Sequence, residues 1–202
     1  MKLFYAPGAC SLASHIVAQE LAIKLDLDKV NLATKVTASG ADFAALNPKG
    51  YVPALQLDDG SVLTEGTAIM QYLADTKPGA KLAPANGTME RYRLQALLGY
   101  INSELHKSFS PLFNPATSPD ARAESQAYLR KRYGYIEGEL RGKSYLTGEN
   151  FTVADAYLFT VTNWAKTVKL DLSEFPNLME FQKRIAARPA AIAAMTVEGL
   201  IK

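Results

Sequence analysis

The strongest constraint on the fold is a change of hydrophobic pattern near Thr76. Before this residue, short apolar runs with strand character alternate with segments of helical periodicity. Lys2–Ala6 is a candidate for a buried strand that ends at Pro7-Gly8, and a helical stripe follows it. After Thr76 only helical periodicity remains, including an almost uniformly apolar segment over Val153–Ala165. The pattern therefore predicts an α/β domain followed by an all-helical domain.

The boundary between the two predicted domains falls in a stretch rich in proline and glycine. We expect the α/β domain over residues 1–77, a linker over 78–87 and the helical domain over 88–202. The first domain should have the order βαβ and then ββα, with a hairpin turn at Asp58-Asp59-Gly60. The last helical stripe of the chain should stop at Pro189.

Composition excludes several classes of protein. The net charge of the 202 residues is only +2, so a nucleic-acid-binding face is not expected. A single cysteine cannot form an internal disulfide, and with only two histidines beside it no Cys/His metal site is expected. No apolar stretch approaches the ~18 residues of a membrane helix, and the apolar run near the N-terminus is too short for a signal peptide. We therefore expect a cytoplasmic protein without a membrane, metal or nucleic-acid partner.

Cys10 is the first candidate for chemistry, because it lies between a strand–turn unit and the start of a helix. With Ser11 as the expected N-cap, the thiol would face the positive end of the helix dipole, which lowers the pKa of a thiol. The alternative is an inert, buried thiol, which is usual for a free cysteine. A redox pair would need a second cysteine at position 13, where Ala13 stands. Any disulfide of Cys10 must therefore form with an outside thiol.

Two further segments of the first domain could bind a ligand. Val52-Pro53 enters a strand, and a cis bond there would turn the Val52 N–H and C=O toward an extended peptide; the alternative is a plain turn proline. Glu65-Gly66 opens a helix whose N-terminus attracts a carboxylate, and Gly66 permits close approach. Glu65 could instead be only a first-turn acid that is favourable to the helix dipole.

In the helical domain, Gln95, Gly99, Ser103 and His106 share one side of a helix. At about 100° per residue they fall on a strip roughly 80° wide, beside the apolar face. Such a strip either is a solvated face or lines a cleft between domains. The other histidine, His15, has no partner that the sequence identifies, and we expect it to be structural.

Thr152 and Asp155 have the spacing of a capping box at the start of the apolar helical segment. Because that segment is apolar all round, the cap should be buried. We therefore expect Asp155 to serve folding rather than catalysis.

Taken together, these segments resemble the glutathione S-transferase family, which joins a thioredoxin-like N-terminal domain to an all-helical C-terminal domain. The resemblance covers essentially the whole chain, and the pair of Cys10 and His106 is similar to the bacterial beta class in particular. The segments that carry it, in order and with consistent spacing, are Lys2–Ser11, Asn47–Leu55, Leu63–Gly66, Glu104–Lys107 and Phe151–Tyr157.

The resemblance implies a site for glutathione, the tripeptide γ-Glu-Cys-Gly, in a cleft between the two domains. Glu65 and the helix start at Gly66 would hold the γ-glutamyl end. The backbone of Val52, next to a cis Pro53, would pair with the cysteinyl unit. Lys35 would meet the glycyl carboxylate.

Catalysis would fall to Cys10 and His106, which the resemblance places at the glutathione sulfur. It also implies a homodimer, in which Ser103 approaches the γ-glutamyl end of the partner's site. Position 66 is a serine in many relatives and is glycine here, so a hydroxyl contact is lost. Position 99 is often polar in close relatives and is Gly99 here, so the resemblance does not imply a partner contact at this position.

The implied activity is conjugation of reduced glutathione, as co-substrate, to small electrophiles, with thiol transfer through a mixed disulfide at Cys10. Tyr5 and Ser11 lie near the catalytic hydroxyls of other classes, but Tyr5 is not expected to act so in the beta class. The alternatives are a glutathione-dependent dehalogenase, a thiol–disulfide exchanger, or a non-catalytic binding protein. The electrophile, which the sequence does not identify, should bind between Pro7–Ala9 and the aromatic side chains near Phe109–Phe113.

Overall fold

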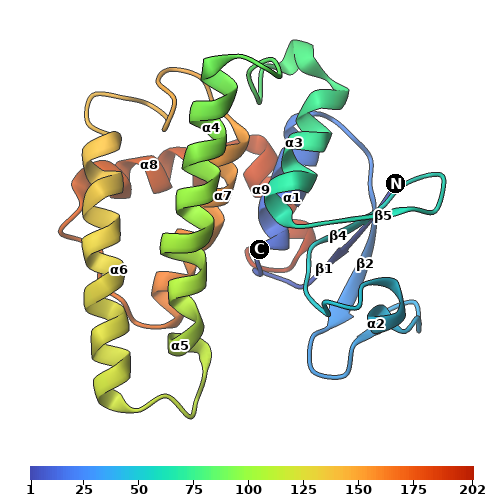
Figure 1. Ribbon diagram of the computed structural model, residues 1–202, viewed down its shortest axis with the longest axis horizontal. Helices are drawn as coiled ribbons and strands as arrows, with labels where there is room; N and C mark the ends of the chain where they lie inside the picture. Colours follow the sequence, from blue (N-terminus) through green and yellow to red (C-terminus); the bar gives the residue numbers. More distant parts are fainter. The chain divides into compact units, whose positions relative to one another are not determined.

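The computed structural model describes the whole chain, Met1–Lys202. The chain forms two compact units: unit 1 combines Met1–Ala83 with Ala187–Lys202, and unit 2 is Pro84–Ala186. All named strands belong to unit 1, whereas unit 2 is helical (Figure 1). The predicted combination of an α/β part and an all-helical part is therefore confirmed.

Unit 1 is built on a mixed five-stranded sheet in the order β3-β2-β1-β4-β5. Its strands are β1 (Lys2–Tyr5), β2 (Asp26–Asn31), β3 (Val36–Thr37), β4 (Ala54–Gln56) and β5 (Val62–Thr64). The pair β1–β2 is parallel, and the other neighbouring pairs are antiparallel. The hairpin predicted at Asp58-Asp59-Gly60 joins β4 to β5. Strand β3 has no counterpart in the sequence prediction.

Helices pack on this sheet within unit 1. They are α1 (Ser11–Glu20), α2 (Phe43–Leu46), α3 (Gly66–Thr76), the 3-10 turn η1 (Pro78–Ala80) and α9 (Pro189–Val197). α1 contacts α3 on one side and α9 on the other (Figure 1). The short α2 packs on the sheet through Phe43, whose ring centroid lies 5.6 Å from that of Phe4. This core places the N-terminal end of α1, with Cys10, next to the loop that precedes β4.

Unit 2 consists of helical segments around an apolar core. They are α4 (Met89–Tyr100), the π-helix η2 (Ile101–His106), the 3-10 turn η3 (Lys107–Phe109), α5 (Ser110–Phe113), α6 (Pro119–Glu139), α7 (Val153–Thr167) and α8 (Pro176–Ala186). As its uniform apolar pattern predicted, α7 is buried over most of its length. Tyr133, Phe109 and Phe181 are fully buried beside it in the same unit.

The end of the chain departs from the prediction. The helix of the last predicted stripe, α8, ends at Ala186, before Pro189 as expected, but a further helix follows it. Pro189 is the first residue of this helix, α9, where a proline fits because its missing N–H needs no partner. α9 packs on α1, so residues 187–202 group with unit 1 and not with the helical domain expected over 88–202. The reason is apolar burial of Ala191, Ala194 and Met195, which no pattern in the sequence assigns to one domain or the other.

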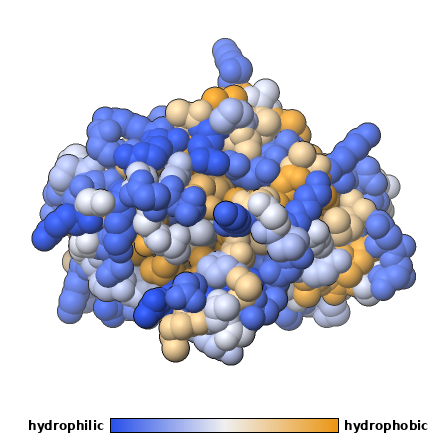
Figure 2. Space-filling view, turned by 90° about the horizontal axis from the view of Figure 1, so that it is seen from above, coloured by the Kyte–Doolittle hydropathy of each residue, from blue (hydrophilic) through white to orange (hydrophobic).

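The surface is mixed in character. Figure 2 shows a face on which hydrophobic residues form separate patches among hydrophilic ones. None of the helices combines the length and the apolar character that a membrane crossing requires.

Candidate functional site

The residues expected to bind a tripeptide in unit 1 meet around one loop, Asn47–Pro53. Lys35 Nζ donates a hydrogen bond of 2.9 Å to the Gly50 carbonyl. Cys10 Sγ donates one of 3.1 Å to the Val52 carbonyl. The Val52–Pro53 bond is cis, as the sequence suggested. The backbone of one short loop therefore lies beside the Lys35 ammonium group and the Cys10 thiol.

The shape of this loop is fixed by Asn47, which is only 2% exposed. Its side-chain amide donates 2.8 Å to the Tyr51 carbonyl, and its Oδ1 accepts from the Lys49 N–H at 3.2 Å. The Val52 N–H forms no hydrogen bond within the chain. The loop, held by its own buried asparagine, thus presents an unpaired donor beside Cys10.

Glu65 and Gly66 lie against the same loop. Lys49 Nζ is 2.7 Å from Glu65 Oε1, and a side chain at position 66 would place its Cβ 3.4 Å from the Pro53 ring. Glu65 is the N-cap residue of α3 and has a positive φ of 69°. Lys35 also has a positive φ, 59°. Such strained conformations in bulky residues concentrate at functional sites, which supports both as ligand-binding positions.

The state of the Cys10 thiol differs from the expectation. Cys10 is itself the N-cap residue of α1, and it is partly buried. Burial raises its pKa to about 11, with a smaller contribution from the Glu65 charge, although the backbone N–H groups of Cys10 and Ser11 act in the opposite direction. The predicted lowering of the pKa is therefore wrong. The free-energy cost of desolvating the thiolate exceeds its stabilisation by the N–H groups at the helix N-terminus. At neutral pH, Cys10 is a thiol.

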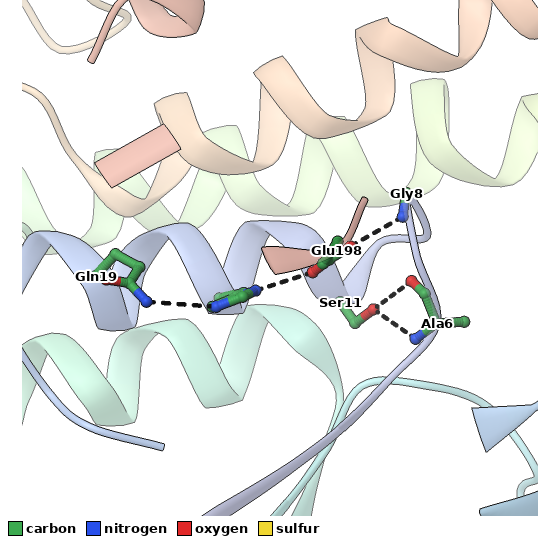
Figure 3. A network of polar contacts seen from close by, with 6 residues as sticks. Ala6, Gly8, Ser11, Gln19 and Glu198 are labelled. Atoms are coloured by element: carbon green, nitrogen blue, oxygen red, sulfur yellow. Dashed lines mark hydrogen bonds and ion pairs between the residues drawn. The ribbon is translucent and has the colours of Figure 1, made fainter. Parts of the chain in front are cut away.

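Ser11 and Tyr5 are not arranged as catalytic hydroxyls in unit 1. Ser11 is the first residue of α1, not its N-cap, and its hydroxyl both donates to the Ala6 carbonyl and accepts from the Ala6 N–H, each at 3.2 Å (Figure 3). Tyr5 is buried at the end of β1, and burial is the main cause of its raised pKa. The Ser11 hydroxyl thus holds the turn that leads to Cys10.

A buried carboxylate holds this turn from the other end of the chain. Glu198 Oε2 accepts from the Gly8 N–H at 2.9 Å, and Oε1 lies 3.0 Å from His15 Nδ1 (Figure 3). His15 therefore has the structural role that we expected, with a partner 183 residues away. No local pattern could have identified Glu198, because its partners are distant in sequence.

In unit 2, Ser103 and His106 lie on η2. The expected strip assumed a constant α-helical pitch from Gln95 to His106, but the helix changes to π-type hydrogen bonding at Ile101. Such π segments are frequent at functional sites. Ser103 is exposed, and its hydroxyl oxygen lies 3.1 Å from the Gly99 carbonyl oxygen and 3.2 Å from Glu104 Oε1, the two acceptors for its single hydrogen. A side chain at Gly99 would meet open space.

The His106 ring is enclosed by aromatic side chains. Its centroid lies 4.8 Å from that of Trp164 and 5.9 Å from that of Tyr157, both edge-on. His106 Nδ1 is 2.6 Å from the Tyr157 hydroxyl. Burial, followed by the charge of Lys107, lowers the pKa of His106 to about 4. At neutral pH the imidazole is therefore uncharged.

Phe109, Phe113 and Trp164 extend this aromatic cluster, with centroid separations of 5.6 Å from Trp164 to each phenylalanine. Phe113 is 48% exposed, so the cluster reaches the surface of unit 2. This is the aromatic segment that the sequence associated with the electrophile. Trp164 and Tyr157 were not predicted, since only the fold brings α7 to η2 and η3.

Asp155 has the predicted capping role. Its Oδ2 accepts from the Thr152 N–H at 2.7 Å and from the Thr152 hydroxyl at 2.8 Å, completing the capping box at α7. Its Oδ1 accepts from the Leu146 N–H at 2.8 Å, a contact that the sequence did not indicate. Asp155 is completely buried. Elsewhere, no group of three or more His, Cys, Asp or Glu side chains is arranged to hold a metal ion.

Comparison with known proteins shows the family of the chain. The family models "Glutathione S-transferase, N-terminal domain" and "Glutathione S-transferase, C-terminal domain" match residues 8–76 and 100–189. Glutathione S-transferase GstA of Escherichia coli O157:H7 is 48% identical over 99% of this chain and 100% of its own.

Solved structures agree over the full length. A sphingomonad glutathione S-transferase complexed with glutathione is 45% identical, with a TM-score of 0.95 and complete coverage of both chains. The beta-class enzyme of Sphingomonas chungbukensis is 47% identical, with a TM-score of 0.96 and the same coverage. The chain therefore belongs to the glutathione S-transferase family, with bacterial beta-class members among its structural neighbours.

Proposed function

We propose that this transferase conjugates reduced glutathione to small electrophiles and binds glutathione at the Asn47–Pro53 loop of unit 1. The observation that carries the proposal is the convergence on that loop of five predicted glutathione-binding residues and Cys10. The binding set, which the loop itself partly supplies, is Lys35, Val52, Pro53, Glu65 and Gly66. The sphingomonad relative, whose structure contains glutathione, supports the same ligand here.

Each part of the tripeptide has a chemical counterpart on this loop. The Lys35 ammonium is suited to the glycyl carboxylate, and the unpaired Val52 N–H is suited to the cysteinyl carbonyl. The helix N-terminus at Gly66 favours the γ-glutamyl carboxylate, and Glu65 favours its ammonium group. An extended zwitterionic peptide fits this set of groups better than an apolar ligand does.

Activation of the glutathione sulfur falls to Cys10 and His106. Because the pKa of Cys10 is about 11, its S–H keeps its hydrogen at neutral pH. By turning this hydrogen from the Val52 carbonyl to the glutathione sulfur, Cys10 stabilises the neighbouring thiolate. His106, which is uncharged at neutral pH, takes up the proton that the glutathione thiol loses. The thiolate then attacks the electrophile, and the leaving group departs with the bonding electrons.

Thiol transfer is the second proposed activity. The Cys10 thiolate attacks the glutathione sulfur of a disulfide between glutathione and a small thiol, forms a mixed disulfide with glutathione, and releases the small thiol as its thiolate. Reduced glutathione then attacks this mixed disulfide, leaves as oxidised glutathione and regenerates the Cys10 thiolate. Cys10 is the only cysteine of the chain, so no second cysteine can attack the mixed disulfide and form an internal disulfide. The raised pKa makes this route slower at neutral pH than at alkaline pH.

We further propose that the enzyme is a homodimer that acts in cytoplasmic detoxification. Exposed Ser103 on η2 supports an approach to the partner's site, and two-fold pairing is the commonest oligomeric arrangement. Light scattering at micromolar concentration should report twice the mass of the 202-residue chain. A monomer would contradict the role of Ser103.

Calorimetry tests the glutathione site. Reduced glutathione should bind the wild-type chain, and Lys35→Met or Glu65→Gln should each weaken binding by about tenfold to a hundredfold, as expected for a lost charged hydrogen bond. Lys24→Met removes an exposed lysine of the same unit and should leave binding unchanged. No binding at millimolar glutathione would overturn the proposed function.

A further inference from the structure

Three side chains of unit 2 form a chain of hydrogen bonds that ends on the His106 ring. The Tyr157 hydroxyl donates to Asn102 Oδ1 at 2.9 Å and lies 2.6 Å from His106 Nδ1. Asn102 and His106 lie on η2, four residues apart, and Tyr157 comes from α7. Tyr157 is only 3% exposed, so its hydroxyl depends on partners within the protein.

The direction of these hydrogen bonds follows from counting hydrogens. A tyrosine hydroxyl carries a single hydrogen, and here it points to Asn102 Oδ1, an oxygen that can only accept. The short contact to His106 Nδ1 is then a hydrogen bond only if Nδ1 carries the hydrogen and donates it. In a neutral imidazole, Nε2 is in that case the unprotonated nitrogen.

We propose that Asn102 and Tyr157 are positioning residues that hold His106 in the tautomer with hydrogen on Nδ1, which leaves Nε2 as the proton acceptor. The proposal rests on the proposed function for its catalytic meaning. The proton of the glutathione thiol passes to Nε2 and yields a thiolate and an imidazolium. The imidazolium then loses this proton to solvent after the thiolate has bonded to the electrophile.

The same chain of hydrogen bonds favours the charged intermediate. An imidazolium donates from both nitrogens, so its Nδ1–H keeps the Tyr157 oxygen as acceptor and no hydrogen bond has to be remade. Burial and the Lys107 charge lower the pKa of His106 and so disfavour the imidazolium, and the hydrogen bond from Nδ1–H to the Tyr157 oxygen offsets part of that cost. The opposite tautomer would present an N–H to the thiol and could not act as its base.

Nitrogen-15 NMR of the two histidines tests the tautomer directly, without ligand or turnover. The signals of His106 are those that disappear in His106→Gln. At neutral pH the correlations of the ring carbon-bound hydrogens should identify Nδ1 as the protonated nitrogen and Nε2 as the unprotonated one. Hydrogen on Nε2 in the wild-type chain would overturn the proposal.

Substitutions at Asn102, an exposed position, separate positioning from folding. Asn102→Leu removes the acceptor, so the Tyr157 hydroxyl turns its hydrogen to Nδ1 and the ring should change to the Nε2–H tautomer. Asn102→Asp keeps an acceptor that cannot donate, and should keep the wild-type tautomer. If Asn102→Leu leaves the tautomer unchanged, Asn102 does not set it and the proposal fails.

Kinetics give the second measurement. Asn102→Leu and Tyr157→Phe should lower kcat for conjugation roughly tenfold or more, with KM for glutathione unchanged, because a misdirected base slows only proton transfer. Tyr133→Phe removes a different buried tyrosine hydroxyl from unit 2 and should leave kcat unchanged. Unaltered conjugation by His106→Gln would contradict the proposed function, whereas the wrong tautomer in the spectrum contradicts the positioning proposal.

Discussion

The two units hold their reactive groups in different ways. In unit 1, Cys10 and Lys35 each donate to a backbone carbonyl of a single loop. In unit 2, His106 depends on side chains from a separate helix. Burial is nevertheless the largest cause of both pKa shifts, raising that of Cys10 to about 11 and lowering that of His106 to about 4. At neutral pH, each unit thus contributes an uncharged hydrogen-bonding group, the Cys10 thiol or the His106 imidazole. We therefore expect neither group to carry a charge before glutathione binds.

The largest effect should come from removing the thiol of unit 1. Cys10→Ala should lose thiol transfer almost entirely, since no other cysteine can form the mixed disulfide. Conjugation should fall only about tenfold to a hundredfold, the cost of one hydrogen-bond donor to the glutathione sulfur. His106→Ala should lower both activities. The two activities should be measured side by side on each variant.

Intact-mass spectrometry gives an independent check on Cys10. After treatment with oxidised glutathione, the wild-type chain should carry one glutathione that reductant removes, and Cys10→Ala should carry none. The adduct should form faster as the pH rises toward 11, because only the thiolate attacks a disulfide. If Cys10→Ala kept full thiol-transfer activity, or if no adduct formed under any oxidising condition, Cys10 would be the inert, buried thiol of the alternative interpretation.

The second largest effect concerns the stability of unit 2. Asp155→Ala leaves the Thr152 and Leu146 donors without their buried acceptor, which should lower the free energy of unfolding by about 3 kcal/mol. Turnover per folded molecule should remain. Asp120→Ala, which removes an exposed acid from the first turn of α6, should cost less than about 0.5 kcal/mol. An unchanged melting temperature together with lost turnover would make Asp155 catalytic.

The contrast between Asp155 and Glu198 shows how much of the fold the sequence could predict. Both are buried carboxylates with backbone N–H partners. The main partner of Asp155 is three residues away, so a capping-box pattern found it. Glu198 binds Gly8 and His15 across 190 and 183 residues, and no local pattern extends so far. The fold class and the capping box of α7 were therefore predictable, whereas the N-cap of α1, expected at Ser11 and found at Cys10, and the return of α9 to unit 1 were not.

The candidate site divides in the same way. Turn and helix-start signals made Cys10, Val52, Glu65 and Gly66 candidates, because the local backbone geometry at these residues can be predicted from the sequence. The sign of the Cys10 pKa shift was predicted wrongly, since the helix N-terminus is visible in the sequence but burial is not. The positioning of His106 by Tyr157 depends on the packing of α7 on η2, which only the tertiary structure provides.

A third, smaller effect is a pair of opposite pH dependences of stability. The pKa of Cys10 is raised from 9.0 to about 11 in the folded state. Its contribution to the free energy of unfolding is therefore fully present below pH 9.0 and is lost as the pH rises to about 11. The folded pKa of His106 is lowered from 6.5 to about 4, so its contribution is present above pH 6.5 and is lost as the pH falls to about 4.

Urea unfolding across this pH range measures both contributions. The difference between wild type and Cys10→Ala should change only on the alkaline side. The difference between wild type and His106→Gln should change only on the acidic side. If both differences in the free energy of unfolding changed in the same pH range, burial could not be the cause of the pKa shifts in both units.

The smallest effect is a gain in ligand affinity at position 66. A Cβ there would lie 3.4 Å and 3.6 Å from Pro53 Cγ and Cδ, which is ordinary contact, so Gly66→Ser should fold with its stability unchanged within about 0.5 kcal/mol. The resemblance to relatives with serine at this position implies one added hydrogen bond to the γ-glutamyl end. Calorimetry should therefore show glutathione binding about three- to tenfold tighter, corresponding to roughly 1 kcal/mol. Gly79→Ser adds the same side chain in open space and should leave affinity unchanged. Weaker binding by Gly66→Ser would show that the ligand needs the bare backbone at the start of α3, in which case the missing hydroxyl is a requirement of this site and not a loss.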